Sequence, residues 1–161
     1  MKLIVKSKPL SNIEIISICK QYGLGLTECC MKNELHSLKV NGHYIINLEN
    51  SNQNGTHWTC LISEKDSCFY FDSFGCIPPQ EIQNLLQKYY KRIYFNNKII
   101  QNLQSVLCGY FCLALLIFLK KNQKVMKKTL LQKCQQFTEI FKSDTKLNDK
   151  VLSDYILNNT D

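Results

Sequence analysis

The architecture of this chain follows from residues 101–112, which read QNLQSVLCGYFC. The first half of this segment is a polar turn, and the second half opens the most apolar run of the chain, which continues to Leu119. Such a change predicts a buried central helix that begins at Cys108. At a helix N-terminus, unpaired backbone N–H groups and the positive end of the dipole favour a thiolate over a thiol. Cys108 is therefore a candidate nucleophile.

Two upstream residues are candidate partners for this thiol. His57 precedes an expected strand over 58–62, and Asp72 ends a second expected strand over 68–72. The turn at 64–67 predicts that these strands form an antiparallel hairpin, with His57 and Asp72 side by side. An imidazole can take a thiol proton and give it to a leaving amine, while a carboxylate holds the ring in the useful tautomer. The three residues predict a Cys-His-Asp site.

The segment before Cys108 also offers an oxyanion donor. Gln101 is expected to project its side-chain amide beside the backbone N–H of Cys108, so that both groups bind the oxyanion of a tetrahedral intermediate. Gln104 lies in the same loop and is the alternative donor if the loop runs differently. Gly109 is expected to leave room for substrate next to the sulfur.

The remaining segments predict an α+β fold in which a small mixed sheet packs on the central helix, with flanking helices, as a single domain over 1–161. Ser11 and Glu14 form a capping box that begins a helix over 12–22. The other expected elements are strands over 43–48, 93–95 and 98–101, a helix that starts at Pro78-Pro79, a basic amphipathic helix over 120–133, and a last helix capped by Asn148.

Composition limits the class of protein. A chain of 161 residues that is 45% hydrophobic can bury a core without a metal or disulfide. Nine cysteines, an odd number, and an N-terminus without a secretory leader indicate free thiols, an intracellular location and no secretion. The cysteine and histidine spacings do not form zinc knuckles, so no metal is expected. The apolar run from Val106 to Leu119 is shorter than the roughly 20 residues that cross a bilayer, so no membrane span is expected.

The charge balance bears on partners. The chain carries 20 Lys+Arg against 13 Asp+Glu, a net charge of +7 that favours anionic partners such as nucleic acid. A run of lysines is more often a solvated helix face than a nucleic-acid groove, so DNA binding is the less favoured interpretation. The lysines that would contact nucleic acid are Lys120, Lys121, Lys124, Lys127 and Lys128.

Together these residues resemble the adenovirus-protease and SUMO-protease type of cysteine peptidase. The resemblance rests on GTHW at 55–58, on YFDSFG at 70–75, and on Gln101 standing seven residues before CGYFC at 108–112, in the order His, Asp, Gln, Cys. It covers about residues 10–120. YIINL at 44–48 and Pro78-Pro79 further resemble the viral branch found in virophages and Polinton-type elements.

The resemblance implies roles for individual residues. Gln101 is favoured over Gln104 because it keeps the seven-residue spacing of the family. Trp58 would pack beside the substrate cleft. The implied catalytic residues are the general base His57, its orienting partner Asp72, the oxyanion donor Gln101 and the nucleophile Cys108.

The resemblance also implies an activity. Members of the viral branch cut capsid and core precursor proteins during virion maturation, often after small residues such as glycine. The chain is therefore expected to be a monomeric viral endopeptidase that acts in the host cell at the site of virus assembly and is packaged in the virion. An isopeptidase that removes ubiquitin-like modifiers is the first alternative, and a catalytically idle DNA-binding or capsid-associated protein is the second.

Cofactors follow only by analogy with the adenovirus-type members. The sequence itself requires no cofactor, but DNA and a short viral peptide assist those members, so either is a candidate activator here. By the same loose analogy, Cys29-Cys30 could host a redox or peptide-cofactor disulfide, although a coincidental pair is the favoured interpretation.

Overall fold

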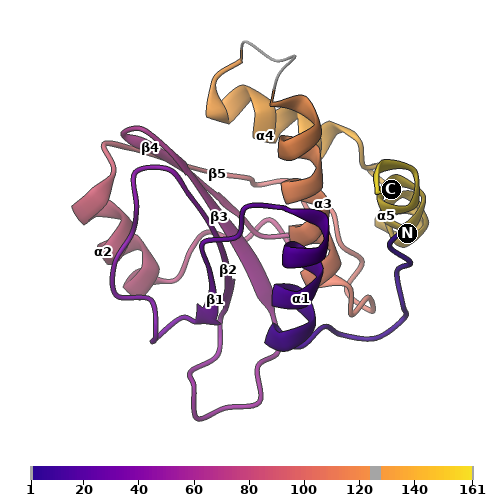
Figure 1. The fold of residues 1–161 in the computed structure, drawn as a ribbon, viewed down its shortest axis with the longest axis horizontal. Coiled ribbons are helices and arrows are strands. Elements are labelled where there is room, and N and C mark those ends of the chain that lie inside the picture. Colours follow the sequence, from indigo (N-terminus) through magenta and orange to yellow (C-terminus); the bar gives the residue numbers. More distant parts are fainter. Residues whose placement is uncertain (1, 124–127, 161) are drawn as a thin grey trace.

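A five-stranded mixed sheet forms the centre of the molecule (Figure 1). The computed structural model describes residues 2–123 and 128–160. The sheet has the strand order β1-β2-β3-β4-β5, in which β2, β3 and β4 are antiparallel and each outer strand is parallel to its neighbour. The strands are β1 (Glu28–Met31), β2 (Gly42–Asn47), β3 (Trp58–Glu64), β4 (Ser67–Phe71) and β5 (Arg92–Phe95).

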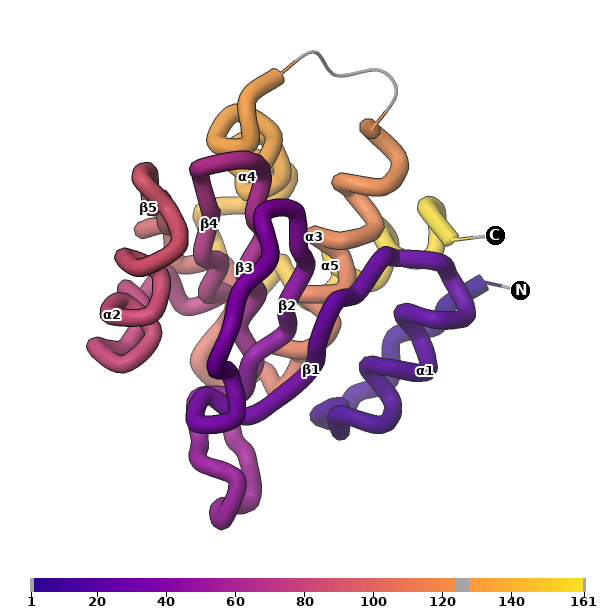
Figure 2. Tube along the Cα trace, turned by 60° about the vertical axis from the view of Figure 1, so that its left-hand side comes forward, coloured from indigo at the N-terminus to yellow at the C-terminus, as the bar shows by residue number. Residues whose placement is uncertain are grey.

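Helices cover both faces of this sheet (Figures 1 and 2). The central helix α3 lies on one face with α1 and α4 beside it, α5 packs against α3, and α2 covers the opposite face. This arrangement confirms the expected α+β fold class. The helices are α1 (Asn12–Tyr22), α2 (Gln80–Tyr89), α3 (Cys108–Asn122), α4 (Leu130–Glu139), the 3-10 turn η1 (Thr145–Leu147) and α5 (Asn148–Asn159).

Strand alternation divides the apolar side chains between two clusters. In β4, Phe69 and Phe71 point to the α3 face, whereas Cys68 and Tyr70 point to the α2 face. Residues 108–119 of α3 are all buried, as expected for a helix that is apolar on every side. The predicted central helix that begins at Cys108 is therefore confirmed. No helix within the two described ranges is long and apolar enough to cross a membrane.

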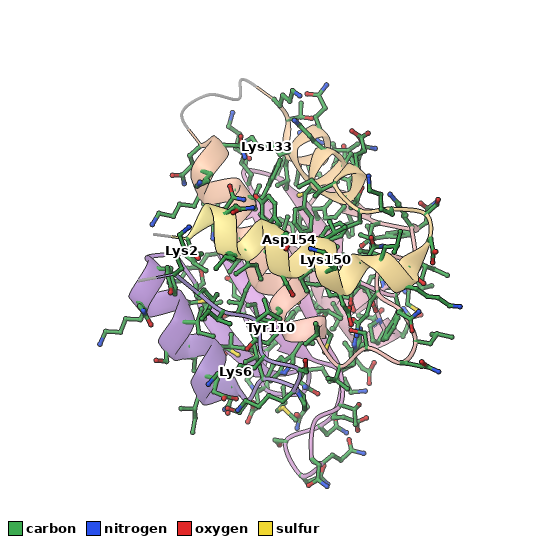
Figure 3. All side chains as sticks on the ribbon, turned by 90° about the vertical axis from the view of Figure 1, so that its right-hand side faces the viewer. Lys2, Lys6, Tyr110, Lys133, Lys150 and Asp154 are labelled. Carbon is green, nitrogen blue, oxygen red and sulfur yellow. The ribbon has the colours of Figure 1, made fainter. Side chains whose placement is uncertain are left out.

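The N-terminal part of the chain matches its sequence pattern. Ser11 and Glu14 form the expected capping box, and α1 ends at Gly23, whose φ of 57° is left-handed. The preceding segment runs along the surface beside α3, where the Lys6 N–H donates to the Tyr110 hydroxyl at 3.2 Å (Figure 3). It thereby brings the two ends of the chain together, because the Leu3 N–H donates to the Thr160 hydroxyl at 2.9 Å.

One expected strand and one expected helix do not form. Residues 98–101 form an irregular segment instead of a strand, because the N–H groups of Ile100 and Gln101 both donate to Ser73 O. The continuous basic helix over 120–133 does not form either, since α3 ends at Asn122 and α4 begins only at Leu130.

Three described lysines of that expected helix, Lys120, Lys121 and Lys128, therefore do not share one continuous helix. Lys120 lies near the end of α3 and donates to Tyr22 O at 2.6 Å, and Lys128 donates to Gln136 Oε1 at 2.8 Å. Lys121 also lies in the last turn of α3, whereas Lys124 and Lys127 lie outside the described residues. Thr129 begins α4 through a second capping box, which the sequence analysis missed.

Asn148 has a different role from the predicted helix cap. Its side chain is fully buried, and Nδ2 donates to Ile100 O at 2.8 Å and to Lys142 O at 2.9 Å. Its Oδ1 accepts the Lys142 N–H at 2.8 Å. Asn148 thus fastens the segment that leads to α3 onto the C-terminal part of the fold.

Replacing this asparagine should destabilise the protein. Asn148→Ala leaves buried backbone groups without partners, and we expect the free energy of unfolding to fall by about 2 to 3 kcal/mol. Asn84→Ala, which removes an exposed amide bonded to Gln80, should change it by less than about 0.5 kcal/mol. Urea denaturation measures both, and equal values for the two variants would contradict this role of Asn148.

Candidate active site

The ends of β3 and β4 bring His57 and Asp72 together. His57 immediately precedes β3 and Asp72 immediately follows β4, so the antiparallel pairing of these strands places both residues at one end of the sheet. His57 Nε2 lies 2.9 Å from Asp72 Oδ1. The Asp72 side chain is only 2% exposed, and its Oδ1 also accepts the Phe74 N–H at 2.8 Å. The carboxylate is therefore held from two directions.

The third residue, Cys108, is the first residue of α3 and is 5% exposed. Its Sγ accepts the Trp58 N–H at 3.5 Å, and the thiol lies close enough to the imidazole of His57 to raise the pKa of that ring. Because Nε2 of that imidazole is bonded to Asp72, Nδ1 is the ring nitrogen left for the sulfur. His57 thus interacts with both the thiol and the carboxylate.

The environment of His57 favours its charged form. Burial alone lowers the pKa of the imidazole, but hydrogen bonds and charge interactions with Asp72 and Cys108 outweigh burial and raise the pKa of His57 to about 9. Its ring also stacks on Phe74, with ring centroids 4.9 Å apart and an angle of 29° between the planes. At neutral pH this geometry supports an imidazolium beside the sulfur.

Gln101 is held rigidly, whereas Gln104 is not. Gln101 is 1% exposed, its Oε1 accepts the Ser73 hydroxyl at 2.6 Å, and its Nε2 donates to Ser105 O at 2.8 Å. Gln104 is exposed, and its backbone N–H bonds to Asn102. The fixed position of Gln101 supports keeping it as the preferred oxyanion donor.

Trp58 and Gly109 pack against the N-terminal segment. Trp58 is buried, and its indole N–H donates to Leu10 O at 2.8 Å. A Cβ on Gly109 would lie 3.3 Å from side-chain atoms of both Leu10 and Trp58. Gly109 therefore allows α3 to approach these side chains, and the space beside it is filled by protein, which differs from the expected room for substrate.

Asn96 and Phe74 support the site but were not found from the sequence. The Asn96 side chain binds both backbone groups of Asp72: Oδ1 accepts its N–H at 3.0 Å, and Nδ2 donates to its carbonyl at 2.7 Å. Asn96 directly follows β5, which is parallel to β4, so only the pairing of these strands brings it to Asp72. The Asn96-Asn97 dipeptide by itself carries no signal beyond that of a loop.

The remaining cysteines differ from Cys108 in environment. All nine, each within the described part of the chain, are free thiols, including Cys29 and Cys30. Burial raises the pKa of Cys112 well above its ordinary value, so this thiol stays neutral. Cys76 alone among the nine is exposed. Within residues 2–123 and 128–160, no group of three His, Cys, Asp or Glu side chains could hold a metal ion.

Solved structures share this fold. No family model matches the sequence, and no curated protein matches it. The selenomethionine crystal structure of an ASFV protease superimposes with a TM-score of 0.52 at 15% identity, over 100% of this chain and 72% of that one. A deletion variant of AvrA, with IP6 and CoA, superimposes with a TM-score of 0.50 at 17% identity, over 90% of this chain and 69% of that one. The chain thus has the fold of adenovirus-protease and SUMO-protease type cysteine peptidases.

The raised pKa of His57 predicts its titration. In NMR spectra, the His57 ring should titrate near pH 9, and Asp72→Asn should lower the midpoint, because the variant loses the hydrogen bond and the charge of Asp72 that raise the pKa against burial. His43, whose pKa burial lowers, is the internal reference and should not shift in this variant. A His57 midpoint near 6.5 in the unmodified protein would contradict the ion-pair geometry.

The raised pKa of His57 also determines whether the free energy of unfolding rises or falls with pH. A raised pKa means that the folded state binds the proton more tightly, so the stabilisation from His57 is fully present below about pH 6.5 and is lost as the pH rises through about 9. The Asp72→Asn variant should show a smaller loss of stability over this pH range, which urea denaturation at a series of pH values would measure.

Gly75 gives a test of how the turn after Asp72 docks. Its φ is 70°, and a Cβ would lie 2.9 Å from the backbone of Lys98, whereas Gly23, also left-handed, would meet only a flexible lysine tip. Gly23→Ala should therefore cost about 1 to 2 kcal/mol of unfolding free energy. Gly75→Ala should cost about 1 to 3 kcal/mol more. Equal costs would show that the turn does not dock as described.

Proposed function

We propose that this protein is a cysteine endopeptidase. The observation that carries the proposal is the position of His57, which bonds to Asp72 through Nε2 and lies near enough to the thiol of Cys108 for that thiol to raise its pKa. A thiol at a helix N-terminus beside an imidazolium is the arrangement that activates cysteine nucleophiles. The likeness to a viral protease of the same fold supports the proposal.

The residues act in a two-step acyl transfer. The Cys108 thiolate attacks the scissile carbonyl, a new S–C bond forms, and the oxyanion is bound by the Cys108 N–H and the Gln101 amide. The C–N bond breaks as His57 gives its proton to the leaving amine. Neutral His57 then takes a proton from water, whose oxygen attacks the thioester and releases the acid. Cys108 returns as thiolate and His57 as imidazolium, with Asp72 holding the ring throughout.

The substrates we propose are viral capsid and core precursor proteins, cut after small residues such as glycine during virion maturation. This substrate class, like the link to virophages and Polinton-type viruses, comes from the sequence resemblance. We therefore propose that the enzyme acts in the infected cell and is packaged in the virion. Trp58, buried beside the sulfur, would form one wall of the substrate cleft. Mass spectrometry of the junctions cut in the precursors of the same virus would identify the specificity.

The alternatives differ in what the site must do. An isopeptidase would cleave ubiquitin-like conjugates with the same residues, and a catalytically idle DNA-binding or capsid-associated protein would leave the thiol unreactive.

DNA and a viral peptide remain proposed activators. Because Lys120 and Lys128 are already engaged in hydrogen bonds, a DNA site would have to draw on other or rearranged lysines. Binding that does not weaken between low and high salt would exclude phosphate contacts.

Covalent labelling tests the nucleophile. A peptide vinyl sulfone that ends in glycine should modify the Cys76→Ser protein, a background that removes the exposed thiol, at a single site. We expect labelling to be lost in Cys108→Ala and kept in Cys112→Ala, because the latter thiol is buried and neutral. Intact mass spectrometry reads the result, and equal labelling of the two variants would overturn the assignment.

A further inference from the structure

Ser73 joins the two halves of the proposed active site. It directly follows Asp72, whose carboxylate holds His57, and its own hydroxyl lies 2.6 Å from Oε1 of Gln101. Ser73 is 1% exposed, and its carbonyl accepts the Gln101 N–H at 2.9 Å. Both the backbone and the side chain of Ser73 therefore hold the glutamine, while the preceding residue holds the general base.

These contacts fix which way the amide of Gln101 points. A backbone carbonyl can only accept hydrogen bonds, so the group that faces Ser105 O at 2.8 Å must be the amide nitrogen. The amide oxygen then faces Ser73, whose hydroxyl must act as the donor. Of the two N–H groups on Nε2, the bond to Ser105 uses one, which leaves the other for a ligand.

We infer that Ser73 is a positioning residue, which keeps the Gln101 amide turned so that its remaining N–H serves the oxyanion. This inference rests on the proposed peptidase function and deepens it. Without the hydroxyl, the buried Oε1 loses its donor, and the bond to Ser105 O alone holds the amide, which can then tilt away from the productive orientation. The nucleophile and the general base do not contact the Ser73 hydroxyl, so they should be unaffected.

Because Ser73 acts on the oxyanion donor and not on the nucleophile, two different reactions of Cys108 Sγ can test its role. The p-nitrophenyl ester of N-acetylglycine is an acyl substrate: Cys108 Sγ bonds to its carbonyl carbon, p-nitrophenolate leaves, and water hydrolyses the thioester. Both steps pass through an oxyanion. Iodoacetamide is the comparison, because Sγ displaces iodide from a saturated carbon without forming one. All variants carry Cys76→Ser, so that the exposed thiol does not contribute.

We expect Ser73→Ala to lower kcat for the ester by about ten-fold, with little change in KM and an unchanged alkylation rate. Gln101→Ala should lower kcat by about 100-fold or more. Adding Ser73→Ala to Gln101→Ala should cause no further loss, because the two residues act through one hydrogen-bond donor. Ser63→Ala is the matched control: this buried serine in β3 donates to Lys39 O at 3.0 Å, away from the site, and its removal should change neither rate.

The outcomes separate this inference from the function on which it rests. If Ser73→Ala retains the unmodified kcat, or loses hydrolysis and alkylation in equal measure, the positioning role is overturned and the peptidase stands. If the unmodified protein alkylates at Cys108 but does not turn over the ester, the proposed function fails, and the role of Ser73 fails with it.

Discussion

The hydrogen bond between His57 and Asp72 is the interaction on which the site depends. His57 is the last residue before β3, and Asp72 is the first residue after β4. The bond forms because both positions lie at the same end of the sheet. The apolar helix α3 is buried on all sides, between that sheet and the neighbouring helices, and its first residue lies beside the imidazole. Sheet register and helix burial together bring a thiol, an imidazole and a carboxylate next to one another.

Other residues, some of them distant in sequence, keep the bond in place. Asn96 holds the backbone of Asp72, Phe74 stacks on the imidazole, and Asn148 ties the segment before Gln101 to the C-terminal helices. The helices after α3 thus have a mechanical role even though they supply no catalytic group. This explains why a small sheet can present a buried, fixed carboxylate at its edge.

Much of this arrangement could be predicted from local patterns. The capping box at Ser11 sets α1, and the single apolar run after Leu107 sets α3, because each signal lies within one element. The hairpin that pairs His57 with Asp72 was also predictable, since strand alternation and a short turn leave one register. The grouping of Cys108 with these two residues was predicted from their complementary chemistry, and the family resemblance added to that prediction.

The errors share a physical cause, which is contact between distant segments. Residues 98–101 have the composition of a strand, yet the N–H groups of Ile100 and Gln101 donate to Ser73 O instead of a neighbouring strand. The space expected beside Gly109 is filled by Leu10, which is about a hundred positions away in the sequence. Asn96 reaches Asp72 only through the pairing of β4 with β5. Local propensity contains no information about such partners.

The most direct measurement is a crystal structure of the protein with N-acetylglycinal, an aldehyde that adds to a reactive thiol. The account predicts a hemithioacetal on Cys108 whose oxygen lies within hydrogen-bond distance of the Cys108 N–H and of Gln101 Nε2, with the His57 ring still bonded to Asp72. An adduct on another cysteine, or an oxygen that points to solvent while the Gln101 amide contacts only Ser73 and Ser105, would contradict it.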